Sequence, residues 1–143
     1  MSDQKRREKY PNTEVFEYFN ANPKNRLTSD CVVRAISTAT DRSYYTVVTD
    51  LADIQMRTGY DSHSNQAIAK LMDRYGWIKH AQPKKSDGTK FTGAEFARRT
   101  VESVCVANIG GHHIVCIKDH KVFDTWDCTG KCVGNYWTRK GGD

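Results

Sequence analysis

The sequence predicts an α+β domain, because helical periodicity fills its middle part and short β-rich runs fill its last third. Apolar residues recur three and four positions apart between residues 29 and 75. After residue 103, runs rich in β-branched and aromatic residues are separated by glycine or polar turns. Helices that precede strands, rather than alternating with them, indicate an antiparallel meander beside a helical layer. A length of 143 residues suits one domain, which we place at 13–143 behind a flexible charged N-terminus at 1–12.

Capping residues and glycines mark where the helices begin and end. Thr28, Ser29 and Asp30 are N-cap residue types, and Gly59 and Gly76 are suited to helix ends. A short helix should begin at the sequence Thr-Gly-Ala-Glu, residues 92–95, which has the spacing of a capping box. The expected helices cover residues 29–40, 43–58 and 64–75, with the short helix from 92.

The strands are expected as short segments bounded by turns. A short strand should cover residues 77–82, and the C-terminal part should contain four more. These run over residues 103–109, 112–117, 121–126 and 132–138. The meander therefore places residues that follow one another in the chain on neighbouring strands.

Composition limits the cellular setting and the partners. No apolar run approaches the roughly 20 residues that span a bilayer, and the N-terminus lacks the apolar core of a signal peptide. We therefore expect a cytoplasmic protein without a membrane partner, whose five cysteines stay reduced. The net charge is +5 and the pI about 9.0, which permits nucleic-acid contact but supports it only weakly.

Cys31 is the first residue that points to chemistry. It lies at the start of the helix predicted for residues 29–40, where the helix dipole and the free amide groups favour a thiolate. Taken alone, a cysteine at this position is more often a small buried apolar residue. Its interpretation therefore depends on the histidines and carboxylates elsewhere in the chain.

The hairpin over residues 112–126 supplies a histidine and a carboxylate. A two-residue turn at Asp119-His120 would make His113 and Asp124 diagonal neighbours on one face, where the carboxylate can orient the imidazole. Trp126 would lie beside them on the same face. A three-residue turn would change the parity and bring His112 to Asp124 instead.

Cysteine at a helix start, histidine on a strand and aspartate on the next strand resembles the order in papain-like cysteine peptidases. The Asp-Thr-Trp sequence at 124–126 is similar to the Asn-Ser-Trp of those enzymes. The stretches NPKNRLTSDCVVRAIS (22–37) and HHIVCIKDHKVFDTWD (112–127) also resemble small proteins encoded by bacteriophages and prophages. The resemblance implies a papain-like fold and a phage origin. The fold would have to be a minimal version, because the cysteine and histidine are only 113 − 31 = 82 residues apart.

Carried over to these positions, the resemblance implies that Cys31 is the nucleophile, His113 the base and Asp124 the orienting residue. Papain-like enzymes hold the oxyanion with a glutamine before the cysteine, and this chain has none there. Asn25 is the expected substitute, with Asn22 as the other available amide and the backbone amide of Cys31 as the second donor. The implied activity is acyl transfer on a protein or peptide substrate, such as a host protein. Peptide or isopeptide hydrolysis comes first, while deamidation, transamidation and cleavage of glycan-linked amides use the same residues.

Two other interpretations of the sequence compete with this one. Cys128 and Cys132, with His120 nearby, have a spacing seen in zinc sites, but a turn with two incidental cysteines fits better because a second close pair of ligands is missing. We therefore expect neither a metal nor another cofactor. The rival function is that of a non-catalytic basic phage protein that binds nucleic acid or a host protein; its Cys31, His113 and Asp124 would be scattered in space.

Overall fold

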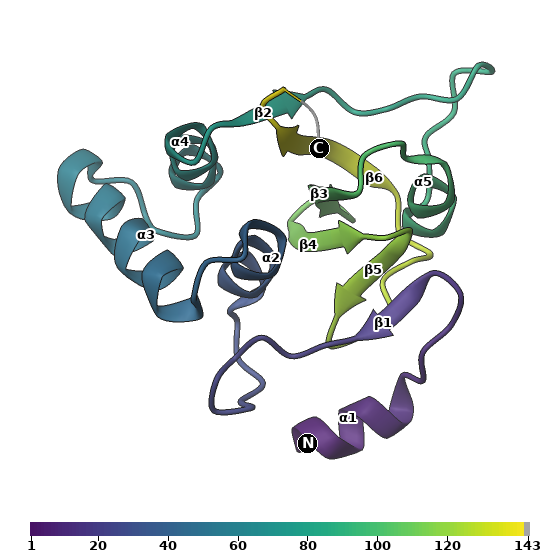
Figure 1. Cartoon of the computed structure of the whole chain (residues 1–143), viewed down its shortest axis with the longest axis horizontal. Coiled ribbons are helices and arrows are strands. Elements are labelled where there is room, and N and C mark those ends of the chain that lie inside the picture. The colour runs from purple at the N-terminus through teal and green to yellow at the C-terminus, as the bar shows by residue number, and fades with distance from the viewer. Residues whose placement is uncertain (142–143) are drawn as a thin grey trace.

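The computed structural model describes residues 1–141 and has an α+β architecture with five helices and six strands (Figure 1). The helices are α1 (Asp3–Lys9), α2 (Cys31–Thr40), α3 (Tyr44–Thr58), α4 (Asn65–Arg74) and α5 (Gly93–Arg99). The strands are β1 (Phe16–Tyr18), β2 (Trp77–His80), β3 (Val104–Ile109), β4 (His113–Lys118), β5 (Lys121–Asp124) and β6 (Val133–Arg139). The α+β class and all the expected helices and strands are confirmed, with boundaries shifted by only a few residues.

The six strands form one mixed sheet in the order β1-β5-β4-β3-β6-β2. The segment β3-β4-β5 is the predicted antiparallel meander. Beyond it, β6 crosses over to pair with the outer side of β3, and β1 pairs with β5 in parallel. The expected meander through all four C-terminal strands is therefore wrong for β6, which does not continue beside β5. The parallel pair was not predicted either, because three residues are too few to show an alternation.

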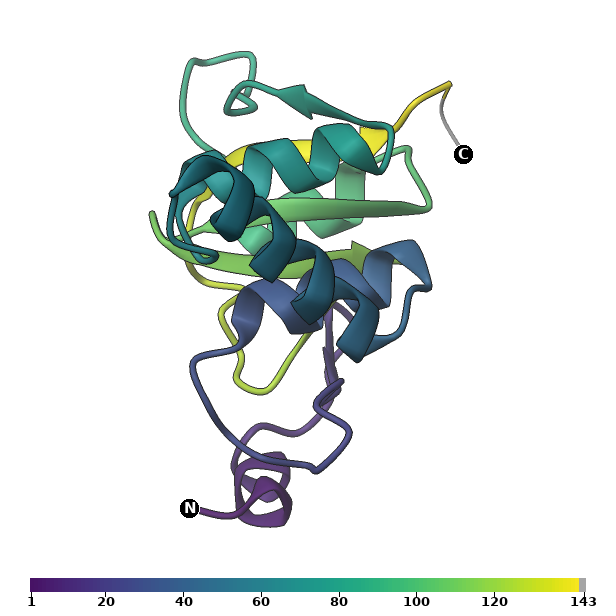
Figure 2. The same cartoon turned by 90° about the vertical axis from the view of Figure 1, so that its left-hand side faces the viewer.

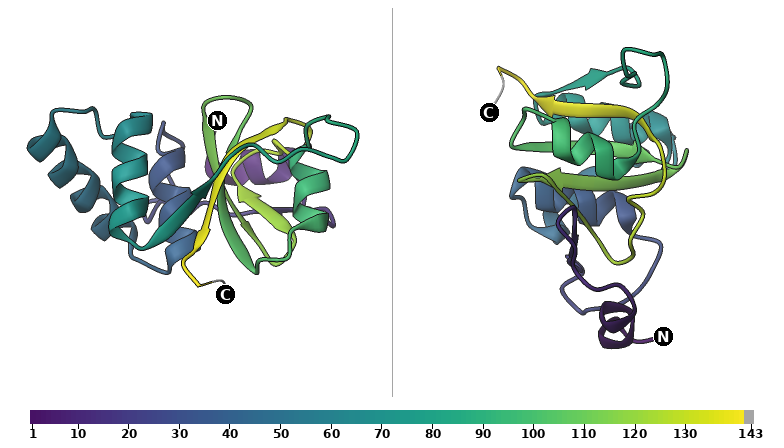
Figure 3. Two further views of the ribbon diagram at one scale, coloured as in Figure 1. Left: turned by 90° about the horizontal axis from the view of Figure 1, so that it is seen from above. Right: turned by 90° about the vertical axis from the view of Figure 1, so that its right-hand side faces the viewer.

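The sheet separates two apolar clusters, one on each face. Figures 2 and 3 show α2, α3 and α4 covering one face, and Figure 3 shows α5 alone on the other. Alternate residues of β4 supply both clusters: Ile114 and Cys116 pack with the three helices, whereas Val115 and Ile117 pack with α5. The period of two along each strand therefore decides on which face a side chain lies.

The N-terminal segment contains a helix that the sequence analysis did not assign. Helix α1 buries none of its residues and begins at the N-cap residue Ser2. Its attachment is polar: the hydroxyl of Tyr18 donates to Asp3 Oδ1 (2.8 Å), and the side chain of Asn20 donates to the same oxygen (3.1 Å). Because no apolar stripe marks such a helix, its sequence looks like an irregular charged segment.

The ends of several elements meet at one edge of the molecule. Because β4 is antiparallel to both β3 and β5, its first residue, His113, lies at the same end as the last residues of those strands, Ile109 and Asp124. Helix α2 packs against β4 and begins with Cys31 at this end. The fold thus brings together chain segments that are about 80 to 90 residues apart in the sequence.

Candidate active site

The turn between β4 and β5 decides which histidine faces Asp124. Asp119 and His120 both have positive φ, at 50° and 65°, as in a two-residue hairpin turn of type I′. Lys118 pairs with Lys121 and Ile117 with Val122, so the predicted two-residue turn is confirmed. Continued along the strands, this register makes His113 the diagonal neighbour of Asp124.

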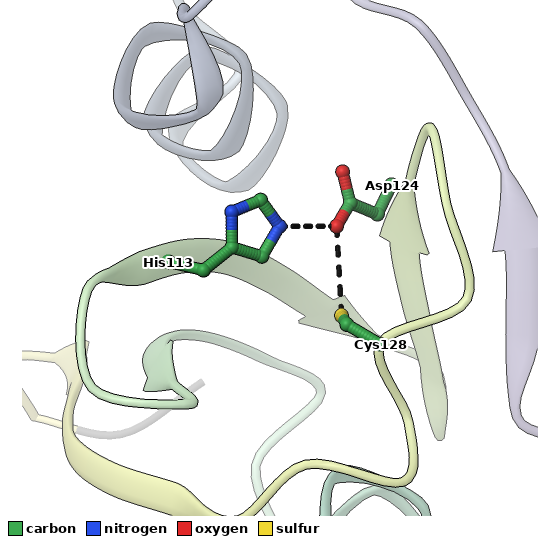
Figure 4. Close-up of side chains that lie close together, drawn as sticks. All are labelled: His113, Asp124 and Cys128. Atoms are coloured by element: carbon green, nitrogen blue, oxygen red, sulfur yellow. Dashed lines mark hydrogen bonds and ion pairs between the residues drawn. The ribbon is translucent and has the colours of Figure 1, made fainter.

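His113 and Asp124 form a direct hydrogen bond. The Nε2 atom of His113 lies 2.5 Å from Oδ2 of Asp124, and Figure 4 shows the ring leaning from β4 towards the end of β5. Only 2% of the Asp124 side chain is exposed, compared with 19% for His113. Trp126 lies beside the imidazole with a ring-centroid separation of 5.0 Å, on the side predicted for it. The carboxylate therefore fixes the orientation of the ring in a nearly dry environment.

Cys31 is the first residue of α2, and its thiol lies close enough to the imidazole of His113 for the ring to affect the pKa of the thiol. Burial alone would raise the pKa of the thiol. The contact with His113, the backbone N–H of Ile114 and the positive charges of His113 and Arg34 outweigh burial and lower that pKa. The side chain is half-buried. The fold thus brings Cys31, His113 and Asp124 together, with a hydrogen bond between the last two.

The same contacts set the charges of His113 and Asp124. Burial disfavours the imidazolium form of His113, but hydrogen bonds to Asp124, Cys128 and Cys31 raise its pKa to about 11. Burial also disfavours a charged Asp124, yet the hydrogen bond from His113 and the charges of His113 and Arg34 lower the pKa of the carboxyl group. Both groups are therefore ionised at neutral pH.

Arg34 holds the opposite oxygen of Asp124. Its Nη1 lies 3.0 Å from Asp124 Oδ1, and its Nε lies 2.8 Å from Oδ1 of Asp30. All three side chains are buried, with exposures of 10% or less. Arg34 thus fixes one oxygen of Asp124 and leaves the other for His113.

Arg34 is a residue of the site that was not predicted, although its spacing from Cys31 and Asp30 is a signal in the sequence. Residues one turn apart on a helix share a face, so an arginine three positions after Cys31 lies on the same side of α2. Asp30 stands four positions before Arg34, at the spacing of a helical ion pair. What the sequence does not show is that this pair is buried, because its third member comes from β5.

Asp30 occupies the N-cap position of α2 without capping it. Its side chain accepts no hydrogen bond from the first turn of the helix. Instead it accepts from Arg34, from the hydroxyl of Tyr44 (2.7 Å) and from the amide of Asn22 (3.0 Å). The first amide groups of α2, beginning with that of Cys31, therefore have no side-chain cap and can receive a bound anion.

Cys128 is a fourth group at the site. Its buried Sγ donates a hydrogen bond to Asp124 Oδ2 (3.5 Å) and lies beside His113. Burial and the neighbouring carboxylate raise the pKa of this thiol to about 11, so it stays protonated at neutral pH. The sequence placed Cys128 only in a turn, and the turn is confirmed by a hydrogen bond from the amide of Lys131 to its carbonyl.

His113, Asp124 and Cys128 offer three metal-ligand types within 4.8 Å of one another (Figure 4). Two ligands of one tetrahedral zinc, each about 2.1 Å from the ion, stand roughly 3.4 Å apart. The 2.5 Å between His113 Nε2 and Asp124 Oδ2 is shorter than that and is the length of a hydrogen bond. Arg34 also occupies the other carboxylate oxygen. The geometry fits a hydrogen-bonded cluster better than a metal centre.

The two asparagines expected to help with an oxyanion do not join the cluster. Asn25 is exposed in the loop before α2, where it lines a surface hollow with residues of the N-terminus such as Asp3, and no contact of its side chain with Cys31 or His113 is seen. Asn22 is buried, and its amide is committed to Asp30 and Tyr44. Of the oxyanion donors expected from the sequence, only the backbone amide of Cys31 lies at the site.

Comparison of the chain with models of protein families, with curated proteins and with solved structures finds no match. Among residues 1–141, no helix has the length and apolar character needed to cross a bilayer.

Proposed function

We propose that the protein is a thiol hydrolase that cleaves peptide or isopeptide bonds through Cys31, His113 and Asp124. The observation that carries the proposal is the hydrogen bond between His113 and the buried carboxylate of Asp124, with the thiol at the start of α2 close enough to the same imidazole for the ring to lower the pKa of that thiol. A nucleophile, a proton carrier and an orienting group in contact are the recognised elements of covalent acyl transfer. Each comes from a different element of the fold.

The resting site contains a thiolate and an imidazolium. The pKa of Cys31 is lowered and that of His113 is raised to about 11, so at neutral pH the proton lies on the ring. Asp124 stabilises the ring charge through Nε2, which leaves Nδ1 for the thiol side. The nucleophile is thus formed before substrate arrives, and the imidazolium is ready as a general acid.

In the first step, the sulfur of Cys31 attacks the carbonyl carbon of the substrate. A C–S bond forms, and the π electrons of the carbonyl move onto its oxygen. When the tetrahedral intermediate collapses, the C–N bond breaks and His113 gives its proton to the leaving amine. The products of this step are a free amine and a thioester on Cys31.

The start of α2 is the place where the oxyanion is stabilised. Asp30 leaves the backbone amide of Cys31 without a cap, and that amide stands next to the attacking sulfur. The positive end of the helix dipole adds a favourable potential for the oxygen charge. Because the carboxylate of Asp30 is bound to Arg34, it does not compete for this position.

In the second step, neutral His113 takes a proton from water, and the resulting hydroxide attacks the thioester. The C–O bond forms, the C–S bond breaks, and a carboxylic acid leaves while the thiolate and imidazolium are restored. With an amine in place of water, the same sequence of steps gives transamidation. With a side-chain amide as substrate, it gives deamidation. A polypeptide substrate, such as a host protein, supplies all these groups.

The proposal extends to a minimal papain-like fold and to phage origin. A cysteine at the start of a helix that packs on a sheet, with histidine and aspartate on consecutive strands, is the arrangement expected for that class. Helix α2 and the β4–β5 hairpin supply all three groups, so a chain of 143 residues is sufficient to build the site.

A peptidyl vinyl sulfone tests this function without knowledge of the natural substrate. Such a probe is attacked by a thiolate and needs a proton at the neighbouring carbon, which the imidazolium of His113 supplies. We expect one adduct on Cys31 by peptide mass spectrometry. We expect no adduct at this site in Cys31→Ala, and labelling slower by at least about 100-fold in His113→Ala.

The matched control is His112→Ala, which removes the exposed imidazole next to His113 and leaves the buried cluster intact. It should be labelled on Cys31 at the rate of the unmodified protein. Adducts on Cys132 with none on Cys31 would refute the proposed nucleophile and favour a non-catalytic protein.

A further inference from the structure

A pocket of about 390 Å³ lies at the same sheet end as the candidate active site. Its volume is in the range of sites that bind small groups or side chains. The walls come from the ends of β3, β6 and the segments next to them, and include Gln82, Lys90, Asn108, Gly111, Cys132 and Gly134. Neither the sequence interpretation nor the proposed mechanism uses this pocket.

The strand register places the pocket beside the nucleophile. Asn108 pairs with Ile114 across β3 and β4, and the backbone N–H of Ile114 contacts the sulfur of Cys31. Paired residues lie on one face, and Ile114 belongs to the face covered by α2. Asn108 therefore projects on the side of the sheet where Cys31 lies, one strand away.

Asn108 contains an unused hydrogen-bonding atom. Within residues 1–141, its Oδ1 is the one buried side-chain polar atom that has no hydrogen-bond partner. Buried polar atoms are nearly always paired, so an exception in a pocket calls for an explanation. The oxygen and nitrogen of an asparagine amide exchange places by a half turn, so this side chain can offer the pocket either a donor or an acceptor.

The pocket is suited to a negatively charged group. Lys90 lines it, and none of the described residues in its wall is acidic. Gly134 keeps it open: a methyl group there would lie 3.7 Å from Cβ of Asn108, in ordinary contact, and would narrow the pocket without a clash. A carboxylate that entered could accept from Lys90 and from the amide of Asn108.

The direction of the imidazole indicates which part of the substrate reaches this pocket. The ring of His113 leans from β4 towards Asp124 on β5 (Figure 4). The leaving nitrogen has to lie at that ring to receive its proton. The acyl part therefore extends to the other side of Cys31, over β3 and β6, where Asn108 and Gly134 line the pocket.

We propose that this pocket binds the side chain of the residue whose carbonyl is attacked, and that it selects an acidic residue there. The inference rests on the proposed function and narrows the substrate class to polypeptides with glutamate or aspartate on the acyl side of the bond. Lys90 and Asn108 are the residues that determine this specificity.

The test uses three chloromethyl ketones, acetyl-Ala-Ala-Xaa, in which Xaa is glutamate, glutamine or lysine. The Cys31 thiolate displaces chloride from the methylene carbon and forms a C–S bond, so each rate can be followed by mass spectrometry of the Cys31 peptide. We expect the glutamate probe to react at least about 10-fold faster than the lysine probe, with glutamine between them. Lys90→Gln, Asn108→Ala and Gly134→Ala should each reduce this preference.

Gly130→Ala is the matched control, because a methyl group there meets no atom within 4 Å and lies outside the pocket. It should keep the preference for glutamate. Equal rates for the three probes, or faster reaction of lysine, would overturn the pocket inference. If the three chloromethyl ketones react at equal rates while iodoacetamide still alkylates Cys31 first, only the specificity inference fails. If Cys31 is unreactive towards iodoacetamide as well, the proposed function fails.

Discussion

Asp53 and Asp124 both accept hydrogen bonds from arginine, but their surroundings differ strongly. Asp53 on α3 binds Arg57 and Arg74 at 2.9 and 3.0 Å, with 38% of its side chain exposed. Asp124 binds Arg34 at 3.0 Å with only 2% exposed, and it also holds His113. The ion-pair chemistry is the same, but water competes for Asp53 and is excluded from Asp124. Burial therefore distinguishes a surface contact from a group that can control the charge of its neighbours.

This difference also separates the consequences of losing each carboxylate. At the surface, water replaces a lost partner and the energy changes little. In the interior, a lost partner leaves a charge that nothing solvates. Arg34, His113 and Cys31 all depend on Asp124, directly or through one contact, so we expect changes there to reach the nucleophile.

The largest expected effect is on the proton carrier. His113→Ala should reduce turnover of a peptide substrate by on the order of 10³-fold or more, because nucleophile and base act as a unit. His112→Ala is the matched control, since the two-residue turn directs the neighbouring histidine away from Asp124. Full activity of His113→Ala with an inactive His112→Ala would show that the other histidine is the proton carrier.

The second effect concerns Arg34. Arg34→Met should lower the free energy of unfolding by about 3–5 kcal/mol, because Asp30 and Asp124 would face each other without the cation between them. Arg34→Lys keeps the charge but cannot bind both carboxylates with a planar guanidinium. Its free energy of unfolding should lie between that of Arg34→Met and that of the unmodified protein. Urea unfolding measures stability, and alkylation of Cys31 measures the site in the same variants. If Arg34→Met has the same free energy of unfolding as the unmodified protein, the buried ion pairs of Arg34 with Asp30 and Asp124 do not stabilise the fold.

The smallest effect is expected at the surface pair. Asp53→Ala should shift Tm by less than about 2 °C and leave the alkylation rate of Cys31 unchanged. Thermal unfolding followed by circular dichroism measures the shift. If Asp53→Ala lost as much stability as Arg34→Met, solvent exposure would not explain the difference in energetic contribution between Asp53 and Asp124.

Local patterns predicted most of the fold. The capping box at 92–95, with its Thr92 and Glu95 side chains, is formed as expected, and the α2, α3 and α4 helices lie where the apolar spacing placed them. The pairing of His113 with Asp124 followed from the turn at Asp119-His120 and the period of a strand. These features depend on residues that are close in the sequence.

The remaining features depend on contacts between distant segments. The Asp30–Arg34 pair looks like any helical ion pair until Asp124, 90 residues later in the chain than Arg34, buries it. Cys128 reaches the site only because the chain after β5 folds back on it. Asn108 is an ordinary polar residue on a strand until the pairing of β3 with β6 places Gly134 and Cys132 beside it in a pocket. No local pattern in the sequence contains this information.

The pH dependence of Cys31 alkylation tests the thiolate–imidazolium pair most directly. The protein is treated briefly with iodoacetamide between pH 5 and 10, and the rate at each cysteine is measured by mass spectrometry beside N-acetylcysteine, which serves as a thiol outside any folded protein. Because the pKa of Cys31 is lowered, its thiolate persists as the pH falls, and its rate should stay high below pH 7, where the reference rate has dropped. Asp124→Asn should move the profile of Cys31 towards that of the reference. A Cys31 rate that follows N-acetylcysteine, or faster labelling of Cys128 or Cys132, would contradict the account.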